Sequence, residues 1–305
     1  MLFMVQNNCI DMNAWYSRVD KPHRPDFVLF DLDPPDDGFA LAIEVAHLIR
    51  ELLDELELPG YVKTSGADGI HVVAPITRRS TFEQTYHFAE RASRLLEERH
   101  AGKVTTEWLK KKREGVLVDH RQNGWGKTIA SVYSVRPKPG APVSTPLRWE
   151  ELTADVRPGD FTMEVPLRRV AEHGDLFSPV LEEPRPLAPA QRALDAIALA
   201  AAFKATLSAP THRPHVNRPW PITIHAADLG GHPIRARLTM RLLYNGIAVG
   251  KVDNGRVYTF VGSWREKKGE EIEYPSASRG QTLTFQALVT ARGRTIKLSY
   301  WVRPR

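Results

Sequence analysis

Hydrophobic positions follow two different periods along the chain, and the period changes near residue 210. Before that point, helical and strand-like segments alternate. Residues 39–56 carry leucines and Val45 at helical spacing and stop at Pro59-Gly60, which predicts an amphipathic helix. Residues 80–100 predict a second helix, with Ser80 as N-cap and Glu83 three residues later in a capping-box pattern.

Short apolar runs between these helices predict buried strands. Residues 27–30 form one such run and lead into the acidic turn before Pro34-Pro35. Residues 61–64, the turn SGADG and residues 70–76 predict a hairpin. Residues 116–120 predict a further strand, with 127–135 as its expected partner. These segments together predict a mixed α+β region.

The chain beyond residue 210 alternates hydrophobic and polar positions. In IRARLTMRLLY the apolar side chains alternate with arginines, Asn245-Gly246 then predicts a tight hairpin, and three later segments repeat the alternation between glycine-bearing turns. This pattern predicts an antiparallel β-sandwich, with an immunoglobulin-like topology as one option. An Ala-rich helix over 190–207 is expected before it. The resulting division is a first domain over 1–200, a linker over 201–220 and a β domain over 221–305.

Composition supports a two-domain globular protein and separates the halves by charge. A length of 305 residues exceeds what one core usually supports. No apolar run approaches the ~18 residues of a membrane span, and the single Cys9 cannot form an intramolecular disulfide, so we expect a cytoplasmic, nucleoid-associated protein with no membrane contact. Residues 211–305 hold 16 Lys and Arg against 6 Asp and Glu, a net charge of +10, whereas the rest carries −4. A basic module suits polyanions such as nucleic acid, although solvated strand faces would give the same composition.

Two carboxylates at the end of the first strand are the leading candidates for chemistry. Asp31 and Asp33 are two residues apart on a strand, so both side chains point to the same side and can share a pair of divalent cations. Phosphoryl transfer uses such a pair, but an isolated DxD also occurs in turns and sugar-binding enzymes. A phosphatase of the haloacid-dehalogenase type is disfavoured, because Pro34 and Pro35 follow and no late acidic loop is present.

Three ordered motifs extend this interpretation. PDFVLFDLDPP, YVKTSGADGIHVVAPI and REGVLVDHRQNGWGKTIASVYSVRPKPGAPVSTPLRWEEL occur in this order. They resemble the polymerase domain of bacterial ligase D, a member of the archaeo-eukaryotic primase superfamily, over about residues 1–200. The resemblance implies a primase-type mixed sheet and a metal-dependent nucleotidyltransferase that adds nucleotides to DNA 3′ ends in non-homologous end joining.

The resemblance also assigns roles to particular residues. It implies a two-metal Mg²⁺ or Mn²⁺ site on Asp31, Asp33 and Asp119. It implies a nucleotide-binding set composed of Ser65, Gly66, Gly69, His71, Lys112, Gln122 and Arg136. The partners implied are DNA with 3′ ends or gaps, nucleoside triphosphates, a DNA ligase and an end-binding protein.

Three departures from the family pattern leave an alternative open. We expect the chain to lack the family's N-terminal section, Asn13 stands where the family usually has His, and Asp68 stands where the turn often has Lys. A catalytically degenerate DNA-binding or scaffold protein is therefore the second hypothesis. A zinc site on His212, His215, His225 and His232 is disfavoured by their irregular spacing.

Overall fold

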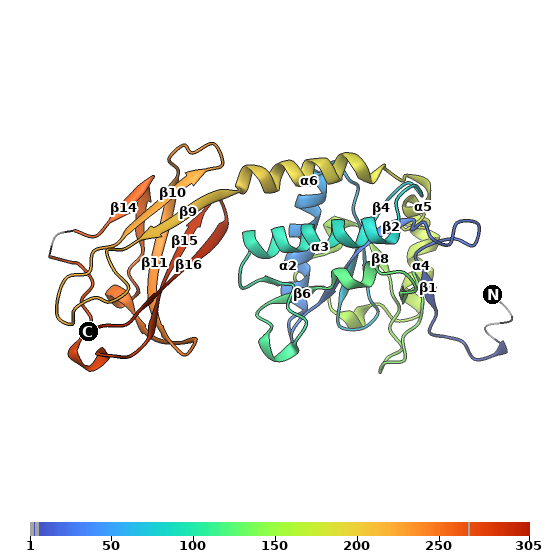
Figure 1. Ribbon diagram of the computed structural model, residues 1–305. Coiled ribbons are helices and arrows are strands. Elements are labelled where there is room, and N and C mark those ends of the chain that lie inside the picture. Colours follow the sequence, from blue (N-terminus) through green and yellow to red (C-terminus); the bar gives the residue numbers. More distant parts are fainter. Residues whose placement is uncertain (1–2, 4–5, 268) are drawn as a thin grey trace. The chain divides into compact units, whose positions relative to one another are not determined.

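The computed structural model describes residues 3, 6–267 and 269–305, and the chain forms two compact units, Met1–Ala196 and Ile197–Arg305 (Figure 1). Among the described residues, no helix is long and apolar enough to span a membrane. The two units are described separately below.

A six-stranded mixed sheet organises the N-terminal unit. Its strand order is β5-β6-β2-β4-β3-β8, and every pairing is antiparallel except β5 with β6. Strands β2 and β4 lie near the middle and are rich in buried β-branched and aromatic residues. Their hairpin partner β3 confirms the hairpin predicted around SGADG. The strands are β2 (Phe27–Asp33), β3 (Tyr61–Thr64), β4 (Ile70–Pro75), β5 (Val104–Thr105), β6 (Val116–Val118) and β8 (Pro146–Leu147).

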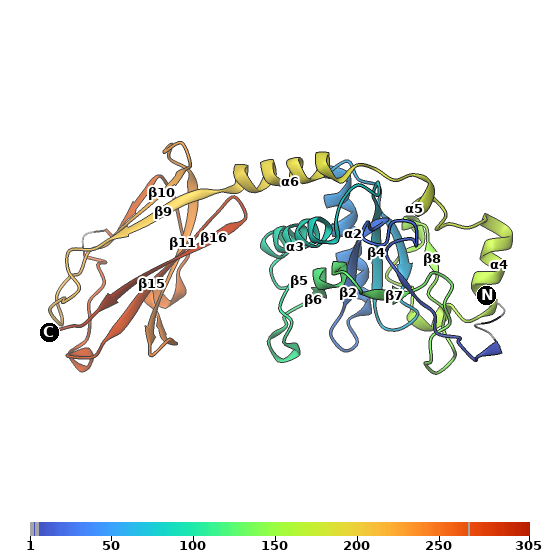
Figure 2. The same cartoon turned by 45° about the vertical axis from the view of Figure 1, so that its right-hand side comes forward.

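Two long amphipathic helices pack on this sheet. Helix α2 (Phe39–Glu55) contacts β2, β4 and β6, and α3 (Phe82–Arg99) contacts β2 and β5; Figure 2 shows both beside the sheet from a second direction. The capping box at the start of α3 lies one residue later than predicted. Thr81, not Ser80, is the N-cap, and it exchanges hydrogen bonds with Gln84. Both pairs fit the sequence pattern, and the extended backbone of Thr81 selects the second.

The strand predicted at 127–135 is shorter and has a different partner from the one expected. Strand β7 (Thr128–Ala130) pairs with β1 (Asn13–Trp15) in a separate two-stranded sheet, while β6 pairs with β2 and β5. The 3₁₀ turn η2 (His120–Asn123) directly follows β6 and takes the chain away from that strand. Asn123 accepts from the Leu29 amide and donates to the Leu29 carbonyl, so the turn is fastened to β2 instead.

The proline-rich region after β7 contains more helix than its sequence predicts. It forms α4 (Glu164–His173), α5 (Pro179–Glu182) and the short 3₁₀ turns η3 (Trp149–Glu151) and η4 (Pro158–Asp160). The Ala-rich helix α6 spans Leu187–Ala201 and does not reach residue 207 as predicted. Residues Phe203–Ser208 alternate buried and exposed side chains and form strand β9 instead.

The C-terminal unit consists of two antiparallel sheets, which confirms the predicted antiparallel β architecture. One has the order β14-β10-β9; the other has the order β12-β11-β15-β16, with β13 also paired to β11. Asn245 and Gly246 have positive φ in the β11–β12 turn, as predicted for a tight hairpin. The strands are β9, β10 (Thr223–Asp228), β11 (Arg235–Tyr244), β12 (Ile247–Lys251), β13 (Tyr258–Val261), β14 (Ser263–Arg265), β15 (Leu283–Ala291) and β16 (Arg294–Val302), with 3₁₀ turns η5 (Val252–Gly255) and η6 (Ser276–Ser278).

The segment expected to be a linker contributes to this core. Within residues 201–220, β9 pairs with β10, and Trp220 is 1% exposed. The Trp220 indole nitrogen donates to the Thr211 carbonyl, and its ring packs edge-on against Tyr274 and Phe285. Prolines around Trp220 interrupt the sequence period, but they do not prevent its burial.

Candidate functional site

A row of polar side chains crosses four adjacent strands of the N-terminal sheet. Lys63 on β3 is paired with His71 on β4, which is paired with Asp31 on β2. Asp119 directly follows β6, and its amide donates to the Asp31 carbonyl at 2.8 Å, which places it next in the row. Cross-strand neighbours share one face of a sheet, so the register itself gathers these side chains.

Lys63 ends this row in a fully satisfied buried position. It is 2% exposed, and its Nζ lies 2.7 Å from His71 Nδ1, 2.9 Å from the Ala130 carbonyl and 2.7 Å from Ser144 Oγ. The Ser144 hydroxyl donates to the Thr64 carbonyl, so it accepts from Lys63. All three ammonium hydrogens thus have acceptors, although burial lowers the pKa of Lys63.

These contacts fix the state of His71. Because Lys63 donates to Nδ1, the neutral ring carries its hydrogen on Nε2, which lies 3.4 Å from Asp31 Oδ1. Burial and then the neighbouring Lys63 lower the pKa of His71, which keeps the ring neutral at physiological pH. His71 is therefore held as a donor directed toward the Asp31 carboxylate.

Two arginines compensate the other carboxylates. Arg113 donates to Asp33 Oδ2 at 2.6 Å, and Arg121 Nε donates to Asp119 Oδ1 at 3.1 Å. The Arg121 guanidinium also lies 4.4 Å from the centroid of the Trp108 ring, a cation–π contact. In the described part of the chain, no group of three or more His, Cys, Asp or Glu side chains is already gathered around a common metal position.

The three carboxylates nevertheless fit divalent cations by their chemistry. Asp31, Asp33 and Asp119 line the same pocket, of about 430 Å³, and supply only hard oxygen donors. Asp33 is bonded to the Arg113 side chain, and Asp119 Oδ1 accepts from both the side chain and the backbone amide of Arg121. A cation could replace the two arginine side chains without breaking the sheet, while the backbone amide still caps the turn η2. Oxygen-only donor sets suit Mg²⁺ or Mn²⁺ rather than zinc or copper.

The SGADG turn forms the adjoining wall of the pocket. The Ser65 hydroxyl accepts from the amides of Ala67 and Gly69, which closes the turn. Arg136 donates to the Ser65 carbonyl. A Cβ at Gly69 would lie 2.5 Å from the Leu32 carbonyl oxygen, so glycine is required there by close approach to β2.

The structure gathers most, but not all, of the residues predicted from the sequence. The pocket is lined by Asp31, Asp33, Ser65, Gly69, His71, Asp119, Gln122 and Arg136. Gly66 is not among its lining residues; it has φ +70°, and a Cβ there would meet Arg136 and Ser144. Lys112 is also not among them and lies exposed in the 3₁₀ turn η1 (Lys110–Lys112).

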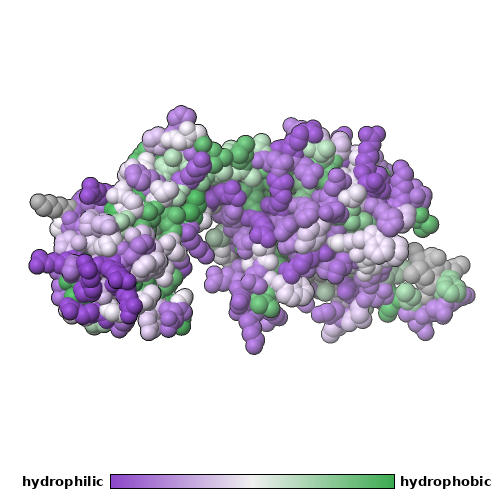
Figure 3. All heavy atoms as spheres, viewed as in Figure 1, coloured by the Kyte–Doolittle hydropathy of each residue, from purple (hydrophilic) through white to green (hydrophobic). Residues whose placement is uncertain are grey.

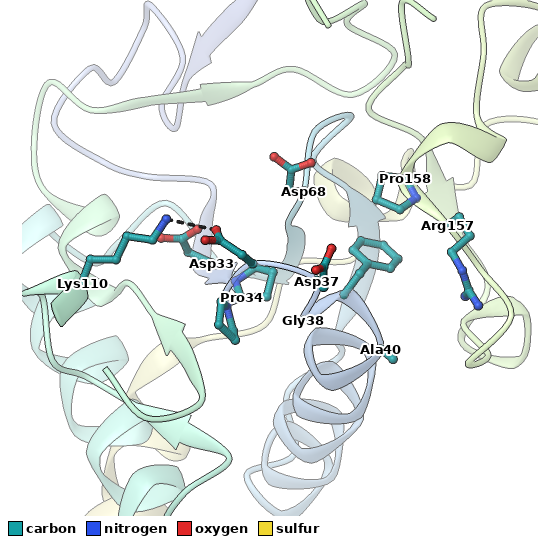
Figure 4. A pocket seen from close by; sticks show the side chains of 12 residues that line it. Asp33, Pro34, Asp37, Gly38, Ala40, Asp68, Lys110, Arg157 and Pro158 are labelled. Atoms are coloured by element: carbon teal, nitrogen blue, oxygen red, sulfur yellow. Dashed lines mark hydrogen bonds and ion pairs between the residues drawn. The ribbon is translucent and has the colours of Figure 1, made fainter. Parts of the chain in front are cut away.

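A second hollow adjoins the pocket on the far side of Asp33. It has a volume of about 660 Å³ and is lined by the β2–α2 turn, Asp68, Lys110, Arg157 and Pro158. Figure 4 shows Lys110 extending toward the acidic turn that begins at Asp33, with Asp68 on a separate loop above it. Lys138 pairs with Asp68 at 3.2 Å, so the acidic residue in the SGADG turn does not stand uncompensated.

Sequence reasoning missed three residues of the site. Arg113 stands one position after the predicted Lys112, and the run KKKR gave no means of choosing between them. Trp108 lines the pocket and contacts Arg121, and it belongs to none of the three sequence motifs. Lys63 was detectable as a lysine inside an otherwise apolar strand next to the histidine strand.

The N-terminal unit is a mixed α+β fold with carboxylates at the ends of adjacent strands, and comparisons with known proteins specify the family. The model of the LigD primase-polymerase domain matches residues 1–177. This chain belongs to that family.

Curated relatives extend well beyond the matched region. The bifunctional non-homologous end joining protein LigD of Bacillus subtilis is 32% identical over 188 residues, covering 61% of this chain and 31% of that protein. The multifunctional non-homologous end joining protein LigD of Pseudomonas aeruginosa is 34% identical over 150 residues, covering 48% and 18%. The match thus spans about a third or less of these relatives' length.

A solved structure gives the same assignment. The polymerase domain of Mycobacterium tuberculosis ligase D in complex with DNA superposes with a TM-score of 0.54 and 27% identity, over 60% of this chain and 67% of that one. Together with the family match over residues 1–177, this likeness confirms the predicted relationship. LigD homologues of this family function in non-homologous end joining.

Proposed function

We propose that this protein is a metal-dependent nucleotidyltransferase that adds nucleotides to DNA 3′ ends during non-homologous end joining. We assign this activity to residues 1–200. The observation that carries the proposal is the convergence of Asp31, Asp33 and Asp119 on one pocket beside the SGADG turn. DNA with 3′ ends or gaps and nucleoside triphosphates are the substrates, and a DNA ligase and an end-binding protein are the functional partners.

The three carboxylates would hold two Mg²⁺ or Mn²⁺ ions in this proposal. Bound there, the ions would activate the primer 3′-hydroxyl and offset the charge of the leaving pyrophosphate. His71 orients Asp31 through its Nε2 hydrogen. With a cation on Asp33, Arg113 would keep its bond to the Trp108 carbonyl and would present its remaining N–H groups to the incoming phosphates.

The nucleotide would lie along the SGADG wall. Arg136 faces the same pocket and supplies positive charge, and Gln122 supplies an uncharged amide for hydrogen bonding. Ser65 and Gly69 shape the turn, because the Ser65 hydroxyl accepts a hydrogen bond from the Gly69 amide. Lys112 is exposed on η1 in the loop that carries Arg113, from which it contributes longer-range attraction for the triphosphate.

Primer extension tests this proposal. The substrate is gapped DNA with a 5′-phosphate, supplied with Mn²⁺ and ribonucleotides, and the parent chain is compared with Asp31→Asn and Asp119→Asn. We expect extension by the parent and a loss of at least about 100-fold in each variant, since each removes a metal-binding charge. Asp54→Asn on the exposed face of α2 is the matched control and should retain activity. Extension that survives in both site variants would refute the metal-site assignment.

A second candidate function is a DNA-binding scaffold descended from the polymerase. It is favoured by Asn13, which lines the pocket where the family usually has histidine. Folded parent protein that binds gapped DNA but shows no extension with Mn²⁺ or Mg²⁺ would establish this function instead.

A further inference from the structure

The outer face of the five-stranded sheet in the C-terminal unit is strongly basic. On β11, Ala236, Leu238 and Met240 point into the core, so Arg235, Arg237 and Arg241 point outward. The same alternation on β16 directs Ile296, Leu298 and Tyr300 to the core and leaves Lys297 outward.

Strand register brings these cations onto one continuous surface. Arg237 is paired with Thr290 on β15, which is paired with Thr295 on β16. The next outward row joins Thr239, Leu288 and Lys297. The row after that joins Arg241 to Gln286 and Ser299, and to Lys251 on β12. We call this surface the basic face, defined by Arg235, Arg237, Arg241, Lys251 and Lys297.

Acidic residues are segregated from the basic face. The sequences of its five strands contain no Asp or Glu. The six acids of the C-terminal unit lie in the other sheet, in η5 or in the loop after β14: Asp228, Asp253, Glu266, Glu270, Glu271 and Glu273. Within the described residues, Arg235, Arg237 and Lys297 form no ion pair and are exposed.

Neutral groups on the basic face complement its charge. Thr290 is bonded to Thr295, and Gln286 is bonded to Arg241 and Ser299, so these neutral groups connect the outward rows. Thr295 and Ser299 are exposed between the cations. Trp301 lies in the last outward row, is 48% exposed and stacks on the His212 ring. Figure 3 shows hydrophilic residues gathered around the C-terminal end of this unit on the side in view.

Solubility or edge protection does not account for this distribution. A surface that only keeps a protein in solution mixes charges of both signs. Lysines that guard a sheet against aggregation belong on edge strands. Three of the five cations stand on β11, which has paired strands on both sides. Segregated positive charge on an interior strand is what a polyanion requires.

We propose that the basic face binds DNA through its phosphate backbone. Arginines and Lys297 contact phosphates, and the exposed hydroxyl groups of Thr295 and Ser299 add hydrogen bonds. The face reads charge and shape rather than sequence, because it presents no element that would enter a groove.

Fluorescence anisotropy with the full chain tests this proposal. The probe is a labelled DNA of about 30 nucleotides, as a single strand and as a duplex, titrated at several salt concentrations. The face variant is Arg235→Ala/Arg237→Ala/Lys297→Ala. The matched control is Lys204→Ala/Arg265→Ala/Arg279→Ala, which removes the same charge from exposed positions off the basic face. A third protein, Arg235→Lys/Arg237→Lys, keeps the charge.

The face variant should lose two to three units of slope in log K against log salt, since each lost phosphate contact removes about 0.7 to 0.9. A fourfold rise in salt would then cost the parent about 20- to 40-fold more affinity than the variant. The control and the lysine protein should keep the parent slope. Equal slopes in the face variant and the control would overturn the proposal, whether or not residues 1–200 bind DNA and extend primers.

Discussion

Replacing Lys63 with Met should lower the unfolding free energy of the N-terminal unit by about 3 kcal/mol. The substitution keeps an unbranched side chain of similar length but removes the donor to three buried acceptors. Each buried acceptor left without a partner costs on the order of 1 to 3 kcal/mol. Removing the buried ammonium charge offsets part of the total cost of the three acceptors, so the net loss of stability lies near the lower bound of about 3 kcal/mol.

Differential scanning calorimetry of the full chain measures the effect. For a unit of this size, about 3 kcal/mol corresponds to a fall of roughly 6 to 12 °C in the melting temperature of its transition. Lys103→Met is the matched control, because Lys103 forms a half-exposed ion pair with Glu44. Such a surface pair contributes about 0 to 1 kcal/mol, so its loss should shift the transition by at most a few degrees.

A Lys63→Met protein as stable as the control would refute the three-acceptor network. The ¹⁵N shifts of the His71 ring give an independent reading. In the parent, the Nδ1 shift should be that of an unprotonated nitrogen that accepts a hydrogen bond, and the Nε2 shift should be that of a protonated nitrogen, because Lys63 donates to Nδ1. In the Lys63→Met variant, the tautomer with its hydrogen on Nε2 should no longer be favoured over the tautomer with its hydrogen on Nδ1.

Three further predictions concern local packing and pH. Gly69→Ala should destabilise the N-terminal unit by about 1 to 3 kcal/mol, because its Cβ would lie 2.5 Å from a backbone oxygen of β2; Gly159→Ala, in open space, should be near neutral in the same urea titration. Thr81→Ala should cost about 1 kcal/mol in urea unfolding and Ser80→Ala much less, since only Thr81 caps α3. Burial raises the pKa of Glu266 to about 7, so its contribution to stability is present below about pH 4.5 and is lost as pH rises through 7. The melting temperature of the C-terminal unit should therefore fall between pH 5 and pH 8, and less so in Glu266→Gln; an equal fall in both proteins would contradict this assignment.

Periodicity was sufficient to predict the fold class of both units. The helical spacing in residues 39–56 and the alternation in residues 234–244 each depend on one buried face, which is a local property of the sequence. The pairing of β7 with β1 depends on residues more than 100 positions apart, and no local pattern contains it. The cap of α3 was misplaced by one residue because two overlapping patterns compete for it.

The candidate site was predictable where chemistry and strand ends coincide. Asp31, Asp33 and Asp119 all terminate apolar runs, and the glycines of SGADG mark a tight approach. Lys63 could not be connected to His71 without the register of β3 and β4. Arg113 could not be distinguished from Lys112, since the 3₁₀ turn decides which basic side chain faces Asp33.

The energetics of the arginine pairs bear on whether the pocket can accept a metal. Asp33 is 58% exposed on its side chain while Arg113 is 13% exposed, so solvent screens the pair from the carboxylate side and a cation can reach Asp33 from solvent. Arg121 is one-third exposed and retains its contact with Trp108 if it leaves Asp119. Three carboxylates on one pocket repel one another, and a divalent cation relieves that repulsion far more strongly than either arginine. The arginine pairs therefore describe a pocket whose negative charge is provisionally compensated, and they favour a metal site that can still be filled over one that has been lost.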